Sequence, residues 1–440
     1  MRELRQILGR LRELERAALP AVLVTIVRVE GSSYRREGAR LLVEPDGRLT
    51  GVLSGGCLER DIVALAASAL ARGAAGIQVY DLTADEEAIW GSGTGCAGRV
   101  TLLIEPLAAP RRQAEIQLLE MLLEKRRELR VATLYAFDGE SGEPSARAGD
   151  RIVLSIEGMA PGAARRAPGS TADETSRLPP TPRRAPPAAE GGSQETAGAA
   201  PQTVASARLP DGSAGAPPAG LSFYGSFFSA PRIAPALGQL HALRAGEARA
   251  SELAVEGGSA ALLCESLLPP IHLLLIGAER DVPALARLGV ELGWAVTVVD
   301  PRPGDAARAR FAPEVAYAGV APRALSSSGL EISARTAVLL ATHRYLDDVA
   351  YLAELGSAPV GWLGLLGPVR RRERILADLA RLDPALAARV RARLSSPAGL
   401  DLGGRAPEEV ALSVVAEIQA HFGGRPARRL SDRPAAEGGA

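Results

Sequence analysis

Two glycine-rich turns that each carry a cysteine are the features of this sequence best suited to chemistry. The first turn contains Ser54, Gly55, Gly56, Cys57 and Glu59, and it joins a short predicted strand to a helix indicated by apolar residues at helical spacing. Glycines allow backbone N–H groups to approach a ligand closely, and a helix N-terminus favours an anion or a thiolate. A cysteine there is suited to act as a nucleophile or a soft ligand. An ordinary turn around a small buried cysteine is the alternative.

The second turn, residues 91–98, contains Gly95 and Cys96 and precedes a predicted strand at 99–105. A plain flexible loop is the alternative. All four histidines lie beyond this region, at positions 241, 272, 343 and 421, so a closed zinc site of Cys and His ligands is not expected in the first domain. The two cysteines are therefore expected to be soft ligands, sulfur carriers or core residues, and no metal-ligand set or catalytic residue is predicted. The third cysteine, Cys264, lies in a leucine-rich strand and is expected to be buried and inert.

A strand–helix–strand unit near residue 271 indicates a second candidate site. Gly277 follows an apolar strand and opens a helix, and Asp300 ends the next strand 23 positions later, which is about the spacing of a carboxylate that binds a ribose hydroxyl. Glu279 occupies the second glycine position of a dinucleotide-binding turn, where a carboxylate would repel a phosphate. The unit therefore predicts a doubly wound parallel sheet and argues against tight dinucleotide binding.

Three further residues follow later strands of this predicted sheet. His343 ends one strand, and Gly364 and Gly367 lie at the end of another. Open α/β sheets bind ligands at the carboxyl ends of their strands, so these residues are candidates for ligand contact. A structural histidine and an ordinary tight turn are the alternatives.

The elements that position these residues fall into two domains of an α/β protein. We predict an N-terminal mixed α/β domain with the Gly-Cys turns at 1–156 and a C-terminal Rossmann-like parallel-sheet domain at 223–422. A Pro/Ala/Gly-rich insertion at 157–222 and a tail at 423–440 are expected to be disordered.

Composition limits the partners and the compartment. The 440 residues have a formal net charge of +0, which gives no indication of a nucleic-acid partner or an anionic membrane surface. Three widely spaced cysteines do not form a disulfide framework, and the amphipathic N-terminus resembles neither a signal peptide nor a membrane span. A cytoplasmic protein is expected, and a homodimer is an open alternative.

Taken together, several motifs resemble the XdhC/CoxI family of accessory factors for molybdenum hydroxylases such as xanthine dehydrogenase. The motifs of the first domain are Gly31-Ser32-Ser33, Arg35-Arg36, Gly38-Ala39, Ser54–Glu59, Gly95–Gly98 and Ile104-Glu105-Pro106. Those of the second domain are Gly277–Val282, Val299–Arg302, Thr342-His343 with Asp347, Gly364–Gly367 and Pro407–Ser413.

The resemblance implies a protein that binds the molybdenum cofactor (molybdopterin), supports its sulfuration together with a cysteine desulfurase, and delivers it to the hydroxylase. It implies cofactor contacts at both glycine turns and at the strand ends named above. An NAD(P)-dependent oxidoreductase and a purely structural adaptor are the alternatives. The sequence departs from the family pattern at Glu279, Arg280, Pro368 and Ala406, and in the long insertion, so the C-terminal site is expected to be altered.

Overall fold

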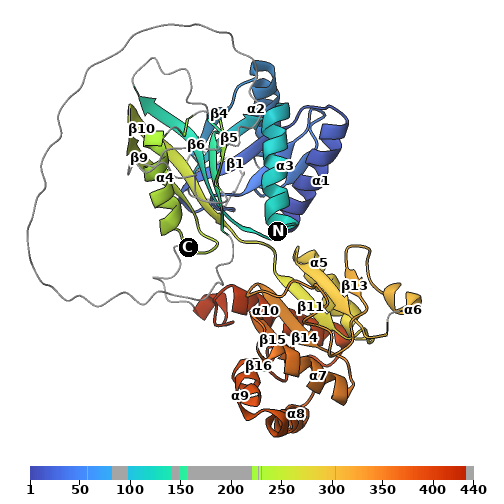
Figure 1. Ribbon diagram of the computed structural model, residues 1–440. Coiled ribbons are helices and arrows are strands. Elements are labelled where there is room, and N and C mark those ends of the chain that lie inside the picture. The colour runs from blue at the N-terminus through green and yellow to red at the C-terminus, as the bar shows by residue number, and fades with distance from the viewer. Residues whose placement is uncertain are drawn as a thin grey trace, which may run out of the picture.

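The computed structural model describes residues 1–56, 58–81, 98–139, 148–156, 221–225, 227–228, 230–302 and 304–432. These residues form two five-stranded sheets in the first half of the protein and one six-stranded sheet in the second half. In Figure 1 the first half lies above the second. The insertion predicted to be disordered at 157–222 lies outside the described residues, except for Leu221 and Ser222, which begin the strand β8 (Leu221–Tyr224). Residues 433–440 of the expected tail also lie outside them. Residues 423–432 of the expected tail are described and end in the short 3-10 helix η2 (Leu430–Asp432).

The first sheet is antiparallel and is covered by helices on both faces. Its strand order is β3 (Leu49–Gly51), β2 (Arg40–Val43), β1 (Val22–Gly31), β5 (Gly98–Pro106) and β4 (Gly76–Asp81). Helix α2 (Glu59–Arg72) packs on one face, and α1 (Arg2–Arg16) and α3 (Ala109–Leu123) pack on the other. The alternation of β1 explains this arrangement, because Val22 and Val24 face α2 while Leu23 between them faces α1 and α3.

The second sheet contains residues that the sequence pattern assigns to the C-terminal domain. Its antiparallel order is β8 (Leu221–Tyr224), β7 (Arg151–Ile156), β6 (Glu128–Gly139), β10 (Gly258–Leu267) and β9 (Ala248–Val255). Helix α4 (Ala230–Ala242) packs against this sheet. The C-terminal domain is expected to begin at 223, but the strands up to residue 267 belong to this second sheet, and the parallel sheet begins only at His272. The physical reason is that β10 pairs with β6 along its whole length, from Gly258 opposite Gly139 to Leu267 opposite Leu129.

Buried ion pairs lie between the two sheets of the first half. Arg40 of β2 donates two hydrogen bonds to Glu265 of β10, at 2.9 and 2.7 Å, and both side chains are almost completely buried. Arg151 of β7 pairs with Glu105 of β5 at 2.7 Å and with Glu115 of α3 at 3.3 Å. Burial raises the pKa of Glu105, which Arg151 partly offsets. These pairs join elements that are far apart in the sequence.

The third sheet is entirely parallel, as predicted for a Rossmann-like domain. Its order is β13 (Ala316–Ala318), β12 (Ala295–Val299), β11 (His272–Ile276), β14 (Thr336–Leu340), β15 (Trp362–Leu365) and β16 (Leu394–Ser395). From β11 the chain first adds strands on one side and then crosses to β14 on the other. The carboxyl ends of β11 and β14 therefore form the point where the winding reverses, and this is where open α/β sheets bind ligands.

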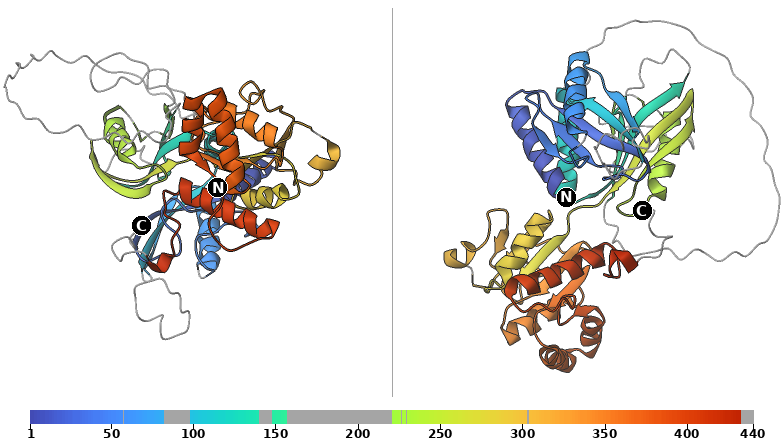
Figure 2. Two further views of the ribbon diagram at one scale, coloured as in Figure 1. Left: turned by 90° about the horizontal axis from the view of Figure 1, so that it is seen from below. Right: turned by 180° about the vertical axis from the view of Figure 1, so that it is seen from behind.

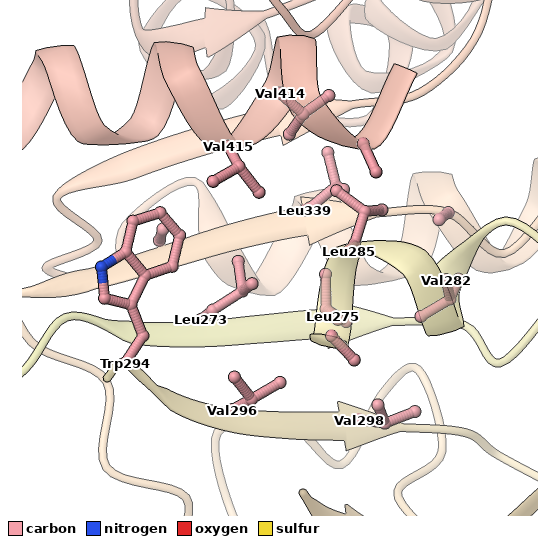
Figure 3. Packing of buried hydrophobic residues seen from close by; sticks show 14 of the residues in the cluster. Leu273, Leu275, Val282, Leu285, Trp294, Val296, Val298, Leu339, Val414 and Val415 are labelled. Atoms are coloured by element: carbon pink, nitrogen blue, oxygen red, sulfur yellow. The ribbon is translucent and has the colours of Figure 1, made fainter. Parts of the chain in front are cut away.

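Helices cover both faces of this parallel sheet. Helices α5 (Val282–Glu291) and α10 (Pro407–Phe422) pack on one face. There Val415 lies over Leu273 of β11 near Trp294, and Val414 lies nearer Leu339 (Figure 3). On the other face are α7 (Tyr345–Leu355), α8 (Val369–Leu382) and α9 (Pro384–Arg393), and Figure 2 shows these layers from two further sides. The α/β fold class is thus confirmed. Within the described residues, no helix is long and apolar enough to span a bilayer.

Candidate functional site

The first glycine turn is organised by the side chain of Ser54. Its buried hydroxyl donates a hydrogen bond to Glu59 Oε2 at 2.6 Å and accepts the backbone N–H groups of Gly56 at 3.1 Å and Leu58 at 3.3 Å. Two of the N–H groups that the sequence offers to a ligand are therefore directed at Ser54. Gly56 has a φ of 113°, in the region that favours glycine, so its residue type is required by the turn.

The turn nevertheless leaves its backbone accessible. A Cβ atom at Gly55 or Gly56 would meet nothing within 4 Å, and both glycines are exposed. Helix α2 begins directly afterwards, and no side chain caps the N–H groups of its first turn. Glu59 and Asp61 lie in that first turn. The glycines fit a ligand that approaches the backbone closely, whereas the two carboxylates of the first turn are bonded to Ser54 and Tyr80.

Cys57, Gly95 and Cys96 lie outside the described residues. The predicted meeting of the two Gly-Cys turns therefore stays a prediction. The third cysteine is described: Cys264 lies fully buried in β10, and burial raises its pKa to about 11. A buried thiol with a raised pKa is a poor nucleophile, and the prediction of a buried Cys264 is confirmed.

At the carboxyl edge of the parallel sheet, Gly277 and His343 lie on adjacent strand ends. A Cβ atom at Gly277 would be 2.4 Å from the carbonyl oxygen of Ala341, and its φ of 115° also favours glycine. His343 is exposed, has a left-handed φ of 53°, and its Nε2 lies 3.1 Å from Asp281 Oδ2. The other oxygen of Asp281, Oδ1, is buried without a hydrogen-bond partner among the described residues. The structure thus brings the predicted Gly277 and His343 together, with Asp281 as an unpredicted third member.

Asp300 lies at the same edge, but its carboxylate is already engaged. Oδ1 accepts the backbone N–H of Arg302 at 3.0 Å, and Oδ2 accepts the hydroxyl of Tyr317 at 3.1 Å. Burial, together with Asp300, raises the pKa of Tyr317 to about 12, so the phenol keeps its proton. Glu279 lies beside Arg302 at 3.7 Å. A ribose would have to displace the Tyr317 hydroxyl and a phosphate would face Glu279, so these contacts do not favour a nicotinamide dinucleotide.

A buried network supports the end of β14. Thr342 donates to Asp348 Oδ1 at 2.5 Å, and Arg371 of α8 donates to Asp348 Oδ2 at 2.6 and 3.1 Å. Burial raises the pKa of Asp348, against the opposing effect of Thr342 and Arg371. Gly367, with a φ of 134°, lies against the Arg371 side chain, because a Cβ there would be 2.8 Å from its Cδ.

Gly364 does not lie in the turn where the sequence pattern predicts it. It is an interior residue of β15, buried and paired with Leu339 of β14 on one side and Ser395 of β16 on the other. Because strands pair on both sides, its backbone has no free edge for a ligand. The candidate contacts at this strand end are therefore reduced to Gly367.

The predicted residues form two separate groups. Ser54, Gly55, Gly56 and Glu59 lie on one turn of the first half. The other described candidates lie in the parallel-sheet domain, at the carboxyl edge of the sheet except for Gly364, which lies inside β15. No hydrogen bond or ion pair of the described residues joins the two groups. Sequence reasoning missed Asp281, whose only signal was its place in the strand-to-helix turn. In the part of the chain that the structure describes, no group of three His, Cys, Asp or Glu side chains could hold a metal ion.

Comparison with known families accounts for both halves of the chain. Residues 14–81 match the model of the XdhC and CoxI family, and residues 273–418 match the model of the XdhC Rossmann domain. The chain belongs to the XdhC and CoxI family. The predicted family is thus confirmed, and the Rossmann match begins within β11, in agreement with the sheet boundary.

Relatives of this XdhC-family chain include proteins from two bacteria. One, from Bacillus subtilis, is named as a probable xanthine dehydrogenase subunit; it is 24% identical over 404 residues, covering 90% of this chain and 92% of that protein. The uncharacterized protein YqeB of Escherichia coli is 32% identical over 147 residues, covering 33% of this chain and 26% of that protein. A crystal structure of a xanthine dehydrogenase from Bacillus halodurans superposes with a TM-score of 0.63 at 23% identity, over 97% of this chain and 98% of that one. This last likeness shows a common fold.

Proposed function

We propose that this chain is an accessory factor for a molybdenum hydroxylase such as xanthine dehydrogenase. The observation that carries the proposal is the family match in both halves, together with the Bacillus subtilis relative, whose name links it to xanthine dehydrogenase and which aligns with 90% of the chain. In this role the chain binds the molybdenum cofactor, supports its sulfuration with a cysteine desulfurase, and passes it to the hydroxylase. In this proposal the chain acts as a carrier of the cofactor.

The glycine turn before α2 supports this role. The exposed backbone of Gly55 and Gly56 suits a ligand that approaches the chain closely, and Cys57, which follows them in the sequence, supplies a soft sulfur atom. The bound cofactor would contribute the molybdenum atom that carries the transferable sulfur. Ser54 holds the turn in shape through its bonds to Gly56 and Glu59.

The test is cofactor retention by cysteine variants of the full chain. Molybdenum and pterin content are measured after purification from cells that make the cofactor. We expect Cys57→Ala to lose most of the bound cofactor. The control is Cys264→Ala, which removes a buried thiol of β10 and should retain it. Equal cofactor content in wild type and Cys57→Ala would remove Cys57 from the site.

A further inference from the structure

Two adjoining cavities lie where the first half meets the parallel-sheet domain. Their volumes are about 280 and 360 Å³, and they share Glu37, Gly38 and Leu267 among their lining residues. The second also reaches Arg335 and Phe422 of the parallel-sheet domain. Figure 1 shows the N-terminal end of α1 and helix α10 at this junction. We call the joined space the interdomain cleft; its size suits a small ligand.

Two carboxylates of the interdomain cleft are paired through both of their oxygens. Both oxygens of Glu3 accept hydrogen bonds from Arg35, at 2.9 and 2.7 Å. Both oxygens of Glu265 accept hydrogen bonds from Arg40. Gly38 is needed for this packing, since a Cβ there would be 2.6 Å from Glu265 Oε1. These two carboxylates offer no free acceptor to a ligand.

The other two carboxylates also have partners. Glu37 accepts the backbone N–H of Val29 at 3.0 Å. Glu247 accepts the backbone N–H of Arg244 at 2.7 Å. Each acidic side chain that lines the interdomain cleft is thus bonded within the protein.

Unlike these carboxylates, several arginines of the interdomain cleft have donor groups without a partner in the described part of the chain. Arg36 is exposed and has no ion pair among the described residues. The Nε atoms of Arg40 and Arg335 are buried and have no hydrogen-bond partner in the described part of the chain. Unpaired donors therefore occur in both halves of the protein, and they favour an acceptor or an anion as the ligand of the interdomain cleft.

On the side of the parallel-sheet domain, Arg335 and Phe422 give the interdomain cleft a flat surface. The Arg335 guanidinium lies 5.4 Å from the ring centroid of Phe422 at the end of α10, and its Nη2 donates to the carbonyl of Pro269 at 3.0 Å. Burial lowers the pKa of Arg335; Glu128 opposes this shift, and nearby Arg126 adds to it. A further anion beside Arg335 would also oppose the lowering. A flat guanidinium–aromatic surface is suited to packing against a planar ring.

We propose that the interdomain cleft binds a phosphate ester with a planar aromatic ring, the class to which mononucleotides belong. Arg36, which lines the first cavity, binds the phosphate, and the ring packs on the Arg335–Phe422 surface that lines the second. Bidentate binding of phosphate by arginine gives such a site its orientation. The proposal does not rest on the molybdenum cofactor, and its test contains none.

The test titrates the full chain with AMP and with pyrophosphate by isothermal calorimetry. AMP should bind saturably, and Arg36→Gln and Arg335→Gln should each weaken it about tenfold or more, which corresponds to about 1.4 kcal/mol. Phe422→Leu should weaken AMP but not pyrophosphate. Arg36 is exposed and has no ion pair in the described part of the chain, so Arg36→Gln should not affect folding; Arg48→Gln is the matched control, because Arg48 is exposed in the β2–β3 turn away from the interdomain cleft.

Three outcomes would overturn the proposal. The first is no saturable binding of either probe, and the second is AMP binding of equal strength in wild type and Arg36→Gln. The third is AMP binding that His343→Asn abolishes while Arg36→Gln leaves it intact, since that would place the nucleotide at the edge of the parallel sheet. Each of these results leaves the cofactor proposal standing, because that proposal is measured through molybdenum content.

Discussion

Lowering the pH should weaken the parallel-sheet domain through His272, the first residue of β11. This buried ring has Nε2 2.9 Å from Thr297 Oγ1 and Nδ1 3.1 Å from Arg126 Nη1. A neutral ring can donate from Nε2 and accept from Arg126, whereas a protonated ring would place its charge against the guanidinium. Burial, followed by Arg126, lowers the pKa of His272 to about 4, against the smaller opposing effect of the Glu331 carbonyl, which lies 3.3 Å from Nδ1.

The sign and size of the effect follow from this shift. The unfolded chain has the ordinary value of 6.5, so it takes up a proton before the folded protein does. Stability is therefore fully present above about pH 6.5 and is lost as the pH falls toward 4. Between pH 7.5 and pH 5.0 the loss from this one group is about 2 kcal/mol.

The assay is urea unfolding at the two pH values, followed by tryptophan fluorescence in a Trp90→Phe background. The remaining tryptophans, Trp294 and Trp362, both belong to the parallel-sheet domain. His272→Asn keeps an oxygen acceptor for Arg126 and does not titrate. Its loss of unfolding free energy between pH 7.5 and 5.0 should be smaller than that of the wild type by about 2 kcal/mol.

The comparison of the two proteins removes the contribution of other titrating groups. Burial raises the pKa values of Glu105 and Asp348, and such groups add stability as the pH falls. They act equally in wild type and His272→Asn. Equal losses in the two proteins would show that His272 does not couple protonation to the stability of this domain.

Two substitutions test the packing described above. Glu265→Gln leaves the buried Arg40 guanidinium without its carboxylate and should lower the free energy of unfolding, measured by urea titration, by about 3–5 kcal/mol. Arg12→Gln breaks an exposed pair and should lower it by at most about 1 kcal/mol. Nearly equal losses in the two variants would contradict the burial of the Arg40 pair. Gly277→Ala should destabilise the parallel-sheet domain by about 1–3 kcal/mol in thermal unfolding, because φ is positive and the new Cβ would meet the Ala341 carbonyl; an unchanged melting temperature would contradict this close approach.

Local patterns in the sequence predicted much of the fold. The turn at Pro45-Asp46-Gly47 indicated a hairpin, and the structure pairs β2 with β3 around it, with Gly47 at a φ of 85°. The apolar run before Gly277 and the strand ending at Asp300 indicated parallel pairing, which the register of β11 and β12 confirms. In both cases the signal lies within about 30 residues of chain, where periodicity and turn residues are informative.

Pairing over longer separations could not be predicted in this way. Residues 221–267 join β6 and β7 across an insertion of more than 60 residues, and nothing local distinguishes that partner from the adjacent parallel sheet. The Asp281–His343 contact likewise joins residues 62 positions apart. The position of Gly364 could not be predicted either, because a glycine inside a buried strand and a glycine in a turn have the same local signal.

The most direct measurement of the proposed function is the cofactor content of the unaltered full chain. The protein is purified from cells that make molybdenum cofactor, and molybdenum and pterin are quantified per chain. The account predicts that both are present at a ratio approaching one per chain. Protein that carries neither from such cells, and takes up neither when incubated with free cofactor, would contradict it.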